Sequence, residues 1–316
     1  MNIRFGVDLG GTKIELIAID TAQQNIEVYR KRIATPKDNY SAIVSAIVQL
    51  ILNAELALGL KGTVGIGIPG ALSRKTGRVK NANTTCLIGE DLQGDLSKQL
   101  QRPIQIANDA NCFTLSEATD GAAVGSEVVF GVIIGTGCGG GVVVNGTILN
   151  GVNAIGGEWG HNPLPWLSAE QSTEAECVTA YTELDCYCGL SGCNETFLSG
   201  SGLERHYALR AGIQGSVSSP TVQEIVARSE QGEAIASELM DDYVVWLAKG
   251  LASVINVIDP DVIVLGGGLS NIDRLYQEVP QIWQQWVFSD RVDTLLLKPK
   301  YGDSSGVRGA AWLSNL

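Results

Sequence analysis

IRFGVDLGGTKIELIAID, residues 3–20, is the stretch that decides the fold class. Its two apolar runs, 3–9 and 13–20, are rich in β-branched residues and predict two strands. Only the triplet GGT separates them, so we expect a hairpin with a tight glycine turn. Successive N–H groups in such a turn can bind a phosphate, which makes this hairpin a candidate nucleotide site as well.

The rest of the chain continues the alternation of strands and helices. Next in order we expect a strand near 26–33, a helix at 38–58, a strand at 63–69, an irregular loop at 71–89, a strand at 103–107 and a helix beginning at 108. The hairpin pattern then returns as a strand at 128–134, the glycine loop GTGCGG at 135–140 and a strand at 141–149. A helix at 237–258 and the strand and glycine loop of DPDVIVLGGG, 259–268, follow near the end. These elements predict an α/β protein with an internal duplication.

Length and charge limit the classes of function. The 316 residues are more than one core usually holds, so we expect two domains with a cleft between them. A net charge of −12 argues against nucleic acid or an anionic membrane as partner, because both bind clustered Lys and Arg, but it allows a nucleotide held by backbone amides. No secretory signal is visible, and the apolar stretch at 243–258 is interrupted by Lys249, so no membrane span is expected. We therefore expect a cytoplasmic protein whose seven cysteines stay reduced.

The second glycine loop resembles a dinucleotide motif only superficially. GTGCGG fits G-x-G-x-x-G, but a β-branched strand follows it where that fingerprint requires a helix, and no P-loop motif occurs in the chain. Two glycine hairpins could instead bind a triphosphate from two sides, with Thr12 and Thr136 adding hydroxyl groups. The alternative is that each loop is merely a tight β-turn.

Two aspartates that follow strands are candidates for the chemistry. Asp8 precedes the first loop and could hold Mg²⁺ through water, or it could simply terminate its strand. Asp109, in the sequence QIANDAN, follows a strand and could accept the proton of a hydroxyl that receives a phosphoryl group. The alternative for the Asn108–Asp109 pair is a helix N-cap.

A cluster of cysteines suggests a metal site. DCYCGLSGCNE, residues 185–195, has the spacing C-x-C-x₄-C, and with the preceding His161 it supplies the four ligands of a closed tetrahedral zinc site. The ligands would be His161, Cys186, Cys188 and Cys193. Such a zinc leaves no position for a substrate, so its role would be to fix the surrounding loop. Reduced free cysteines are the alternative reading.

The other cysteines and the second histidine carry less information. Cys177 lies in the 24-residue spacer before Cys186 and is an alternative ligand. We expect Cys86, Cys112 and Cys138 to be small packing residues and His206 to be a surface or packing residue.

The ordered motifs resemble the ROK family of bacterial sugar kinases over almost the whole chain. They are FGVDLGGTK at 5–13, GIGIPG at 65–70, NDANC at 108–112, IGTGCGGG at 134–141, GGEWGH at 156–161, CYCGLSGCNE at 186–195 and DPDVIVLGGG at 259–268. The resemblance implies a two-domain fold of the actin, hexokinase and Hsp70 (ribonuclease H-like) ATPase type, with an interdomain cleft. It also implies transfer of the ATP γ-phosphate to the 6-hydroxyl of a hexose, with Mg²⁺ and a structural Zn²⁺.

The resemblance assigns roles to particular residues. Asp109 matches the catalytic base. The residues matching sugar ligands are Asn83, Asn108, Asp109, Glu158, His161 and Glu195, and those matching the zinc ligands are His161, Cys186, Cys188 and Cys193. The residues matching the phosphate and nucleotide loops are Asp8, Gly10, Gly11, Thr12, Lys13, Gly135, Thr136, Gly137, Gly266 and Gly267.

Finer features of the resemblance concern the sugar and the domains. KNANTT, EWGHNPLPW and GDSSGVRGAAW look most like the fructokinase, or manno(fructo)kinase, branch, and N-acetylglucosamine kinase is the next resemblance, with glucokinase as a further alternative. A sugar sensor that has lost catalysis is the alternative from another class. We expect a smaller domain of residues 1–107 plus about 301–316 and a larger domain, 108–300, with the zinc-binding loop. The family also allows a homodimer.

Overall fold

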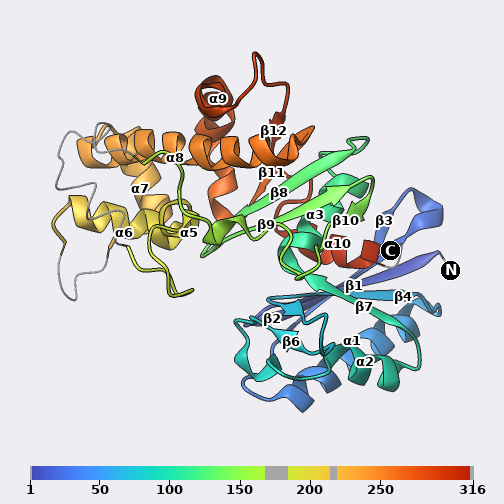
Figure 1. Cartoon of the computed structure of the whole chain (residues 1–316). Coiled ribbons are helices and arrows are strands. Elements are labelled where there is room, and N and C mark those ends of the chain that lie inside the picture. Colours follow the sequence, from blue (N-terminus) through green and yellow to red (C-terminus); the bar gives the residue numbers. More distant parts are fainter. Residues whose placement is uncertain (1, 168–183, 214–218, 314–316) are drawn as a thin grey trace. The chain divides into compact units, whose positions relative to one another are not determined.

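The computed structural model describes residues 2–167, 184–213 and 219–313 (Figure 1). The chain divides into two compact units, which are described one at a time. Unit 1 consists of Met1–Gly131, Gly141–Gly157 and Pro299–Leu316, and unit 2 of Val132–Gly140 and Glu158–Lys298. The expected domain boundaries at 107 and 300 stay a prediction.

Unit 1 is built on a five-stranded mixed sheet. Its order is β3 (Ile26–Ala34), β2 (Lys13–Asp20), β1 (Ile3–Leu9), β4 (Thr63–Ile68) and β7 (Ile104–Asn108). The strands β1, β2 and β3 pair antiparallel, whereas β1, β4 and β7 are parallel. The predicted opening hairpin is therefore confirmed, and the carboxyl ends of three parallel strands meet at one edge of the sheet.

Helices cover both faces of this sheet (Figure 1). On one face lie α1 (Tyr40–Leu58) and α2 (Leu92–Leu100), and on the other lie α3 (Asp109–Thr119) and α10 (Ser305–Trp312). The helix α10 approaches the sheet closely, because a Cβ on Gly6 would lie 2.1 Å from the Val307 carbonyl oxygen and a Cβ on Gly65 would lie 2.0 Å from that of Ala310. Only glycine at these two positions allows such an approach.

Among the helices in the described ranges, only α1 is long and apolar enough to cross a membrane. Its Asn39 side chain caps the N-terminus, and Gly59 ends it with a left-handed φ of 65°. Its Ile43, Ile47 and Ile51 are fully buried in the hydrophobic core of unit 1. This burial is that of a core helix packed on a sheet.

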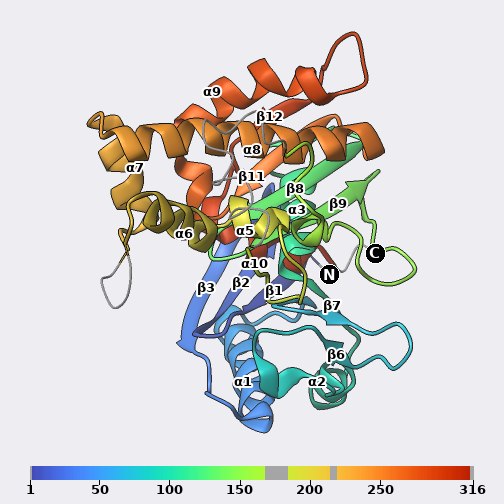
Figure 2. The same cartoon turned by 60° about the vertical axis from the view of Figure 1, so that its left-hand side comes forward.

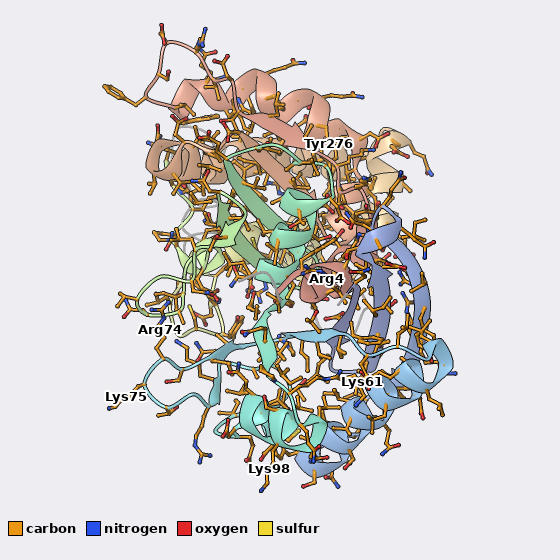
Figure 3. All side chains as sticks on the ribbon, turned by 90° about the vertical axis from the view of Figure 1, so that its right-hand side faces the viewer. Arg4, Lys61, Arg74, Lys75, Lys98 and Tyr276 are labelled. Atoms are coloured by element: carbon orange, nitrogen blue, oxygen red, sulfur yellow. The ribbon has the colours of Figure 1, made fainter. Side chains whose placement is uncertain are left out.

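The region expected to be an irregular loop, 71–89, has more structure than predicted. It contains the short antiparallel pair β5 (Ala71–Leu72) and β6 (Val79–Lys80) and the 3₁₀ turn η2 (Thr85–Leu87). Arg74 and Lys75 lie at the outer end of this small hairpin (Figure 3). The apolar pattern was too short to indicate the two-residue strands.

The second five-stranded sheet has the same order as the first. It runs β10 (Thr147–Ile148), β9 (Cys138–Val144), β8 (Val128–Ile134), β11 (Val262–Gly266) and β12 (Leu295–Leu297). If the five strands of each sheet are numbered by their order in the chain, both sheets have the spatial order 3-2-1-4-5. This agreement supports the predicted internal duplication. The strand predicted at 141–149 was wrong in its bounds, because β9 begins at Cys138 and a turn at Asn145 and Gly146, both with positive φ, separates it from β10.

Unit 2 contains five α-helices among its described residues (Figure 2). They are α5 (Asn194–Leu198), α6 (Gly200–Arg210), α7 (Val222–Glu230), α8 (Ala234–Ile258) and α9 (Asp273–Ile282). The long helix α8 contacts each of the other four. His206 is buried between the rings of Phe197 and Trp246, and burial lowers its pKa to about 3, so it is a neutral packing residue as expected.

Short 3₁₀ segments complete the description. Besides η2 they are η1 (Thr21–Gln23), η3 (Trp159–His161), η5 (Gly268–Asn271), η6 (Trp283–Trp286) and η7 (Gly302–Ser304).

Candidate active site and metal centre

The carboxyl edge of the parallel strands in unit 1 collects the predicted catalytic residues. Across the sheet, Asp8 on β1 is in register with Gly67 on β4, and Gly67 with Ala107 on β7. A Cβ on Gly67 would lie 3.7 Å from Asp8 Oδ1. Asp109 follows β7 directly as the first residue of α3. The two aspartates, 101 positions apart in the chain, therefore lie at the same edge.

The Asn108–Asp109 pair divides two roles between its members. Asn108 has extended backbone angles and is the N-cap of α3, with its Oδ1 accepting a hydrogen bond of 2.8 Å from the Ala110 N–H. Asp109 is exposed, and its Oδ1 also accepts from the Ala110 N–H at 2.8 Å. The cap, which was the alternative reading of the pair, belongs to Asn108. Asp109 is left at the helix start with an exposed carboxylate.

The surroundings of Asp8 disfavour the ionised form of its carboxyl group. Burial, which has the largest effect, and the nearby carboxylates of Asp109 and Glu15 together raise the pKa of Asp8 to about 6. A divalent cation at this edge would offset the repulsion between these carboxylates. The arrangement therefore suits Mg²⁺, held through water as expected for Asp8.

The first glycine loop is held by its own sheet. The Gly10 N–H donates to the Lys13 carbonyl at 2.9 Å, and the Thr35 Oγ1 hydroxyl donates to the Gly10 carbonyl at 2.7 Å. The Thr35 N–H donates to the Thr12 carbonyl at 3.0 Å. Gly11 and Thr12 remain exposed, as a phosphate-binding loop requires, whereas the Lys13 ammonium lies 3.9 Å from the Glu15 carboxylate.

The segment after β4 adds the predicted sugar residue Asn83. The Asn83 N–H donates to the Pro69 carbonyl at 3.1 Å, which fixes this segment just beyond the end of β4. Its neighbour Thr84 was missed by the sequence reading. The Thr84 Oγ1 is buried without a hydrogen-bond partner among the described residues, and a Cβ on Gly11 would lie 3.8 Å from it. A buried, unpaired hydroxyl beside the loop is a further candidate for contact with a substrate.

The second glycine loop belongs to unit 2. Its ends close through the Gly135 N–H, which donates to the Gly137 carbonyl at 3.0 Å, while Thr136 and Gly137 are exposed. Strand β9 follows at once, so the rejection of a dinucleotide fingerprint is confirmed. The predicted residue Gly266 ends β11, and the next residue, Gly267, has φ 82° and lies so close that its Cβ would stand 2.5 Å from the Ile134 carbonyl oxygen.

The four predicted zinc ligands come together in unit 2. One ligand atom from each residue of the His161–Cys186–Cys188–Cys193 set lies within 4.8 Å of the others. Cys186 Sγ is 3.5 Å from His161 Nδ1, and Cys188 Sγ is 3.6 Å from Cys193 Sγ. Zinc bonds of about 2.0–2.3 Å in a tetrahedron place ligand atoms about 3.3–3.8 Å apart, so the geometry fits a closed zinc site. Cys177 lies outside the described residues.

Tyr187 lies beside this cluster, and the sequence analysis did not predict its contact with His161. His161 turns Nδ1 to the cysteines, and its Nε2 lies 3.0 Å from the hydroxyl of Tyr187, which stands between two of the ligands in the sequence. Second partners of this kind fix the ring orientation of a metal-binding histidine. The remaining cysteines behave as predicted, since Cys112 and Cys138 are buried and Cys86 is half-buried.

Two of the residues expected to bind the sugar, Glu158 and Glu195, lie close in sequence to the ligands of the cysteine cluster. They differ in exposure and in hydrogen bonding. Glu158 is exposed and precedes η3, which contains His161. Glu195 is two residues after Cys193, and its Oε2 accepts a hydrogen bond of 3.0 Å from the Cys138 N–H of the glycine loop. One oxygen of Glu195 is therefore engaged by the loop.

The predicted site residues thus form two groups. Unit 1 holds Asp8, Gly10, Gly11, Thr12, Lys13, Asn83, Asn108 and Asp109. Unit 2 holds Gly135, Thr136, Gly137, Glu158, His161, Cys186, Cys188, Cys193, Glu195, Gly266 and Gly267. Each group contains one glycine hairpin.

Known proteins match this chain along its full length. The ROK family profile matches residues 4–315. The N-acetyl-D-glucosamine kinase of Yersinia enterocolitica is 40% identical over 309 residues, and that of Photobacterium profundum is 40% identical over 313 residues, with 98% of each chain covered in both cases.

Solved structures agree with the sequence matches. The ROK hexokinase from Thermus thermophilus is 28% identical with a TM-score of 0.82, covering 98% of this chain and 97% of that one. A ROK family glucokinase from Streptomyces griseus, in complex with glucose and AMPPNP, is 27% identical with a TM-score of 0.76 and 98% coverage of both chains. The predicted α/β fold of the actin and hexokinase type is confirmed. The chain therefore belongs to the ROK family, among its ATP-dependent sugar kinases.

Proposed function

We propose that the protein transfers the γ-phosphate of ATP to the 6-hydroxyl of a hexose, with fructose as the preferred acceptor and mannose as a further one. The observation that carries the reaction is the exposed carboxylate of Asp109 at the start of α3, beside Asp8 at the carboxyl edge of unit 1. Phosphoryl transfer needs positioning, charge stabilisation and a group that accepts the hydroxyl proton. Asp109 is the proton acceptor in this proposal.

Each of the other groups has one task. The N–H groups of the two glycine loops, with the hydroxyls of Thr12 and Thr136, bind the phosphates of ATP. Asp8 would hold Mg²⁺, which would supply positive charge to the transferred group. The loop of Gly266 and Gly267, next to the second phosphate loop, contacts the nucleoside.

In this proposal, the sugar is bound by side chains that form hydrogen bonds with its hydroxyl groups. A carboxylate accepts hydrogen bonds from hydroxyl groups, and an amide side chain both accepts and donates them, which suits a polyol. We assign this role to Asn83, Asn108, Glu158, His161 and Glu195. The four ligands of the cysteine cluster would hold a structural Zn²⁺, which fixes the loop from which His161 and Glu195 act.

The identity of the hexose has two candidates. The segments KNANTT, EWGHNPLPW and GDSSGVRGAAW favour fructose, whereas the names of the 40%-identical relatives favour N-acetyl-D-glucosamine as the second candidate. The difference between them is one acetamido group and the ring form, which pocket shape decides. We place the enzyme in the cytoplasm, where ATP and reduced cysteines coexist.

The proposal is tested by sugar-dependent ADP release from Mg²⁺-ATP. The panel is fructose, mannose, glucose, N-acetylglucosamine and N-acetylmannosamine, and kcat/KM is compared across it. The highest value for fructose supports the proposal, and the highest value for N-acetylglucosamine replaces the acceptor while keeping the reaction. Folded, zinc-loaded protein that binds a sugar but releases no ADP would instead indicate a sensor.

A further inference from the structure

The second glycine loop, residues 135–138, makes hydrogen bonds with the segment that follows the cysteine cluster, residues 195–201. We propose that this segment, residues 195–201, is a clamp for the loop 135–138, and that Ser201 is a positioning residue for ATP. The inference rests on the proposed function, because it concerns the phosphates of the same nucleotide. All the residues of the clamp and the loop belong to unit 2.

Three residues of the segment contact the loop in turn. The Gly200 N–H donates to the Gly135 carbonyl at 2.7 Å, and the Ser201 hydroxyl donates to the Thr136 carbonyl at 2.9 Å. At the end of the loop, the Cys138 N–H donates to Glu195 Oε2 at 3.0 Å. Two carbonyls and one N–H of four consecutive loop residues are thus bound by the segment.

These contacts determine which way the loop amides point. A trans peptide is planar, with its C=O and N–H on opposite sides, so a carbonyl bound on one side turns the next N–H to the other. Binding of the Gly135 and Thr136 carbonyls therefore turns the N–H groups of Thr136 and Gly137 away from the segment. Two successive N–H groups on one side form an anion-binding arrangement.

The fit between clamp and loop is tight enough to require small residues. A Cβ on Gly137 would stand 2.9 Å from Glu195 Oε2, and a Cβ on Gly200 would stand 3.1 Å from the Gly135 carbonyl oxygen. Glycine at both positions therefore permits the direct contacts.

The segment is itself anchored at both ends. Toward the cysteine cluster, the Thr196 hydroxyl donates to the Cys193 carbonyl at 2.8 Å. Toward the helices, the Tyr243 hydroxyl of α8 donates to the Leu198 carbonyl at 2.8 Å, and the Ser199 hydroxyl caps α6 by accepting from the Gly202 N–H at 3.0 Å. The clamp is a fixed part of unit 2, so it can impose its geometry on the exposed loop.

Ser201 allows the test because its side chain is exposed, so its removal should leave the fold intact. Ser201→Ala removes the hydrogen bond to the Thr136 carbonyl together with the 3.0 Å bond to the Ser199 hydroxyl, and Ser201→Thr restores a hydroxyl for both. Ser253→Ala is the matched control, since the Ser253 hydroxyl donates to the Gly250 carbonyl within α8. Calorimetry measures the affinity of each protein for Mg²⁺-AMPPNP and for the preferred hexose.

We expect Ser201→Ala to weaken Mg²⁺-AMPPNP binding about three- to tenfold, the effect of one hydrogen bond, with hexose affinity unchanged. Ser201→Thr should recover at least half of the loss, and Ser253→Ala should match the wild type. Unchanged AMPPNP affinity in Ser201→Ala, equal weakening of both ligands, or failure of Ser201→Thr to recover affinity overturns the clamp. A wild-type protein that binds no Mg²⁺-AMPPNP overturns the proposed function together with it.

Discussion

The two glycine hairpins occupy the same place in two sheets of the same strand order, but they are held in different ways. The first loop is fixed locally, by the Gly10–Lys13 hydrogen bond and by Thr35 at the end of the neighbouring strand β3. The second is fixed by Glu195, Gly200 and Ser201, about 60 residues further along the chain. A duplicated element has kept its position and its exposed tip while its support has changed.

This difference separates two tasks. The first hairpin lies in the unit that also holds Asp8 and Asp109, the residues to which the proposed function assigns the chemistry. The second lies in the unit of the cysteine cluster, which would be a metal-dependent scaffold in the proposed function. Loss of the proposed base in unit 1 should alter turnover, whereas changes near the cluster should alter binding.

The largest effect is expected from Asp109→Asn. Loss of the proton acceptor should lower kcat about 10²- to 10⁴-fold, with hexose affinity kept within a few-fold, because the amide has the same shape. Steady-state kinetics and calorimetry measure the two quantities. Asp273→Asn, at the first residue of α9, is the matched control and should have full activity. Unchanged turnover in Asp109→Asn would remove Asp109 as the base.

A change in the cysteine cluster should come next. Cys188→Ala removes one of four ligands, so zinc content should fall and hexose affinity should drop about 10- to 100-fold as the loop loses its support. Metal analysis and hexose titration are made on the same samples, with Cys86→Ala in unit 1 as control. If zinc-free protein bound hexose with full affinity, the positional role of the cluster would be refuted.

The pH dependence of stability should identify Asp8. Its pKa of about 6 in the folded protein exceeds the unfolded value of 3.8, so the contribution of Asp8 to stability is fully present below about pH 4 and is lost as pH rises through 6. Without Mg²⁺, the free energy of unfolding of the wild type should fall between these limits by up to about 3 kcal/mol relative to Asp8→Asn. Urea unfolding at several pH values measures this difference. A constant difference across that range would contradict the costly charge.

The smallest effect is expected at the support of the first loop. Thr35→Val removes the hydroxyl that donates to the Gly10 carbonyl, so the KM for ATP should rise about two- to fivefold. Because this support is local, the rise should be the same before and after zinc is chelated. A rise that disappears in zinc-free protein would show that the two loops are not held independently.

The sequence predicted best what is local in the chain. The opening hairpin follows from two short apolar runs on either side of three turn residues, and the cysteine cluster follows from three cysteines within eight positions. The β9–β10 turn was missed although Asn145-Gly146 is a common hairpin signal, because the apolar run across it resembles one strand.

Contacts between distant segments could not be predicted. Nothing in the pattern around Ser201 indicates that its hydroxyl reaches the Thr136 carbonyl, 65 residues earlier. Likewise, the Asp8–Gly67–Ala107 row depends on the register of three parallel strands, which the separate apolar runs do not determine. Thr84 and Tyr187 become candidates only through their neighbours in space.

The most direct test of the account is phosphorus NMR of zinc-loaded protein with Mg²⁺-ATP and each hexose, for the wild type and Asp109→Asn. The account predicts that one hexose yields a sugar 6-phosphate signal in equal amount to ADP, and that this signal grows far more slowly with Asp109→Asn. Unchanged ATP with every hexose, or conversion of ATP to ADP and inorganic phosphate alone, would contradict transfer to a sugar hydroxyl.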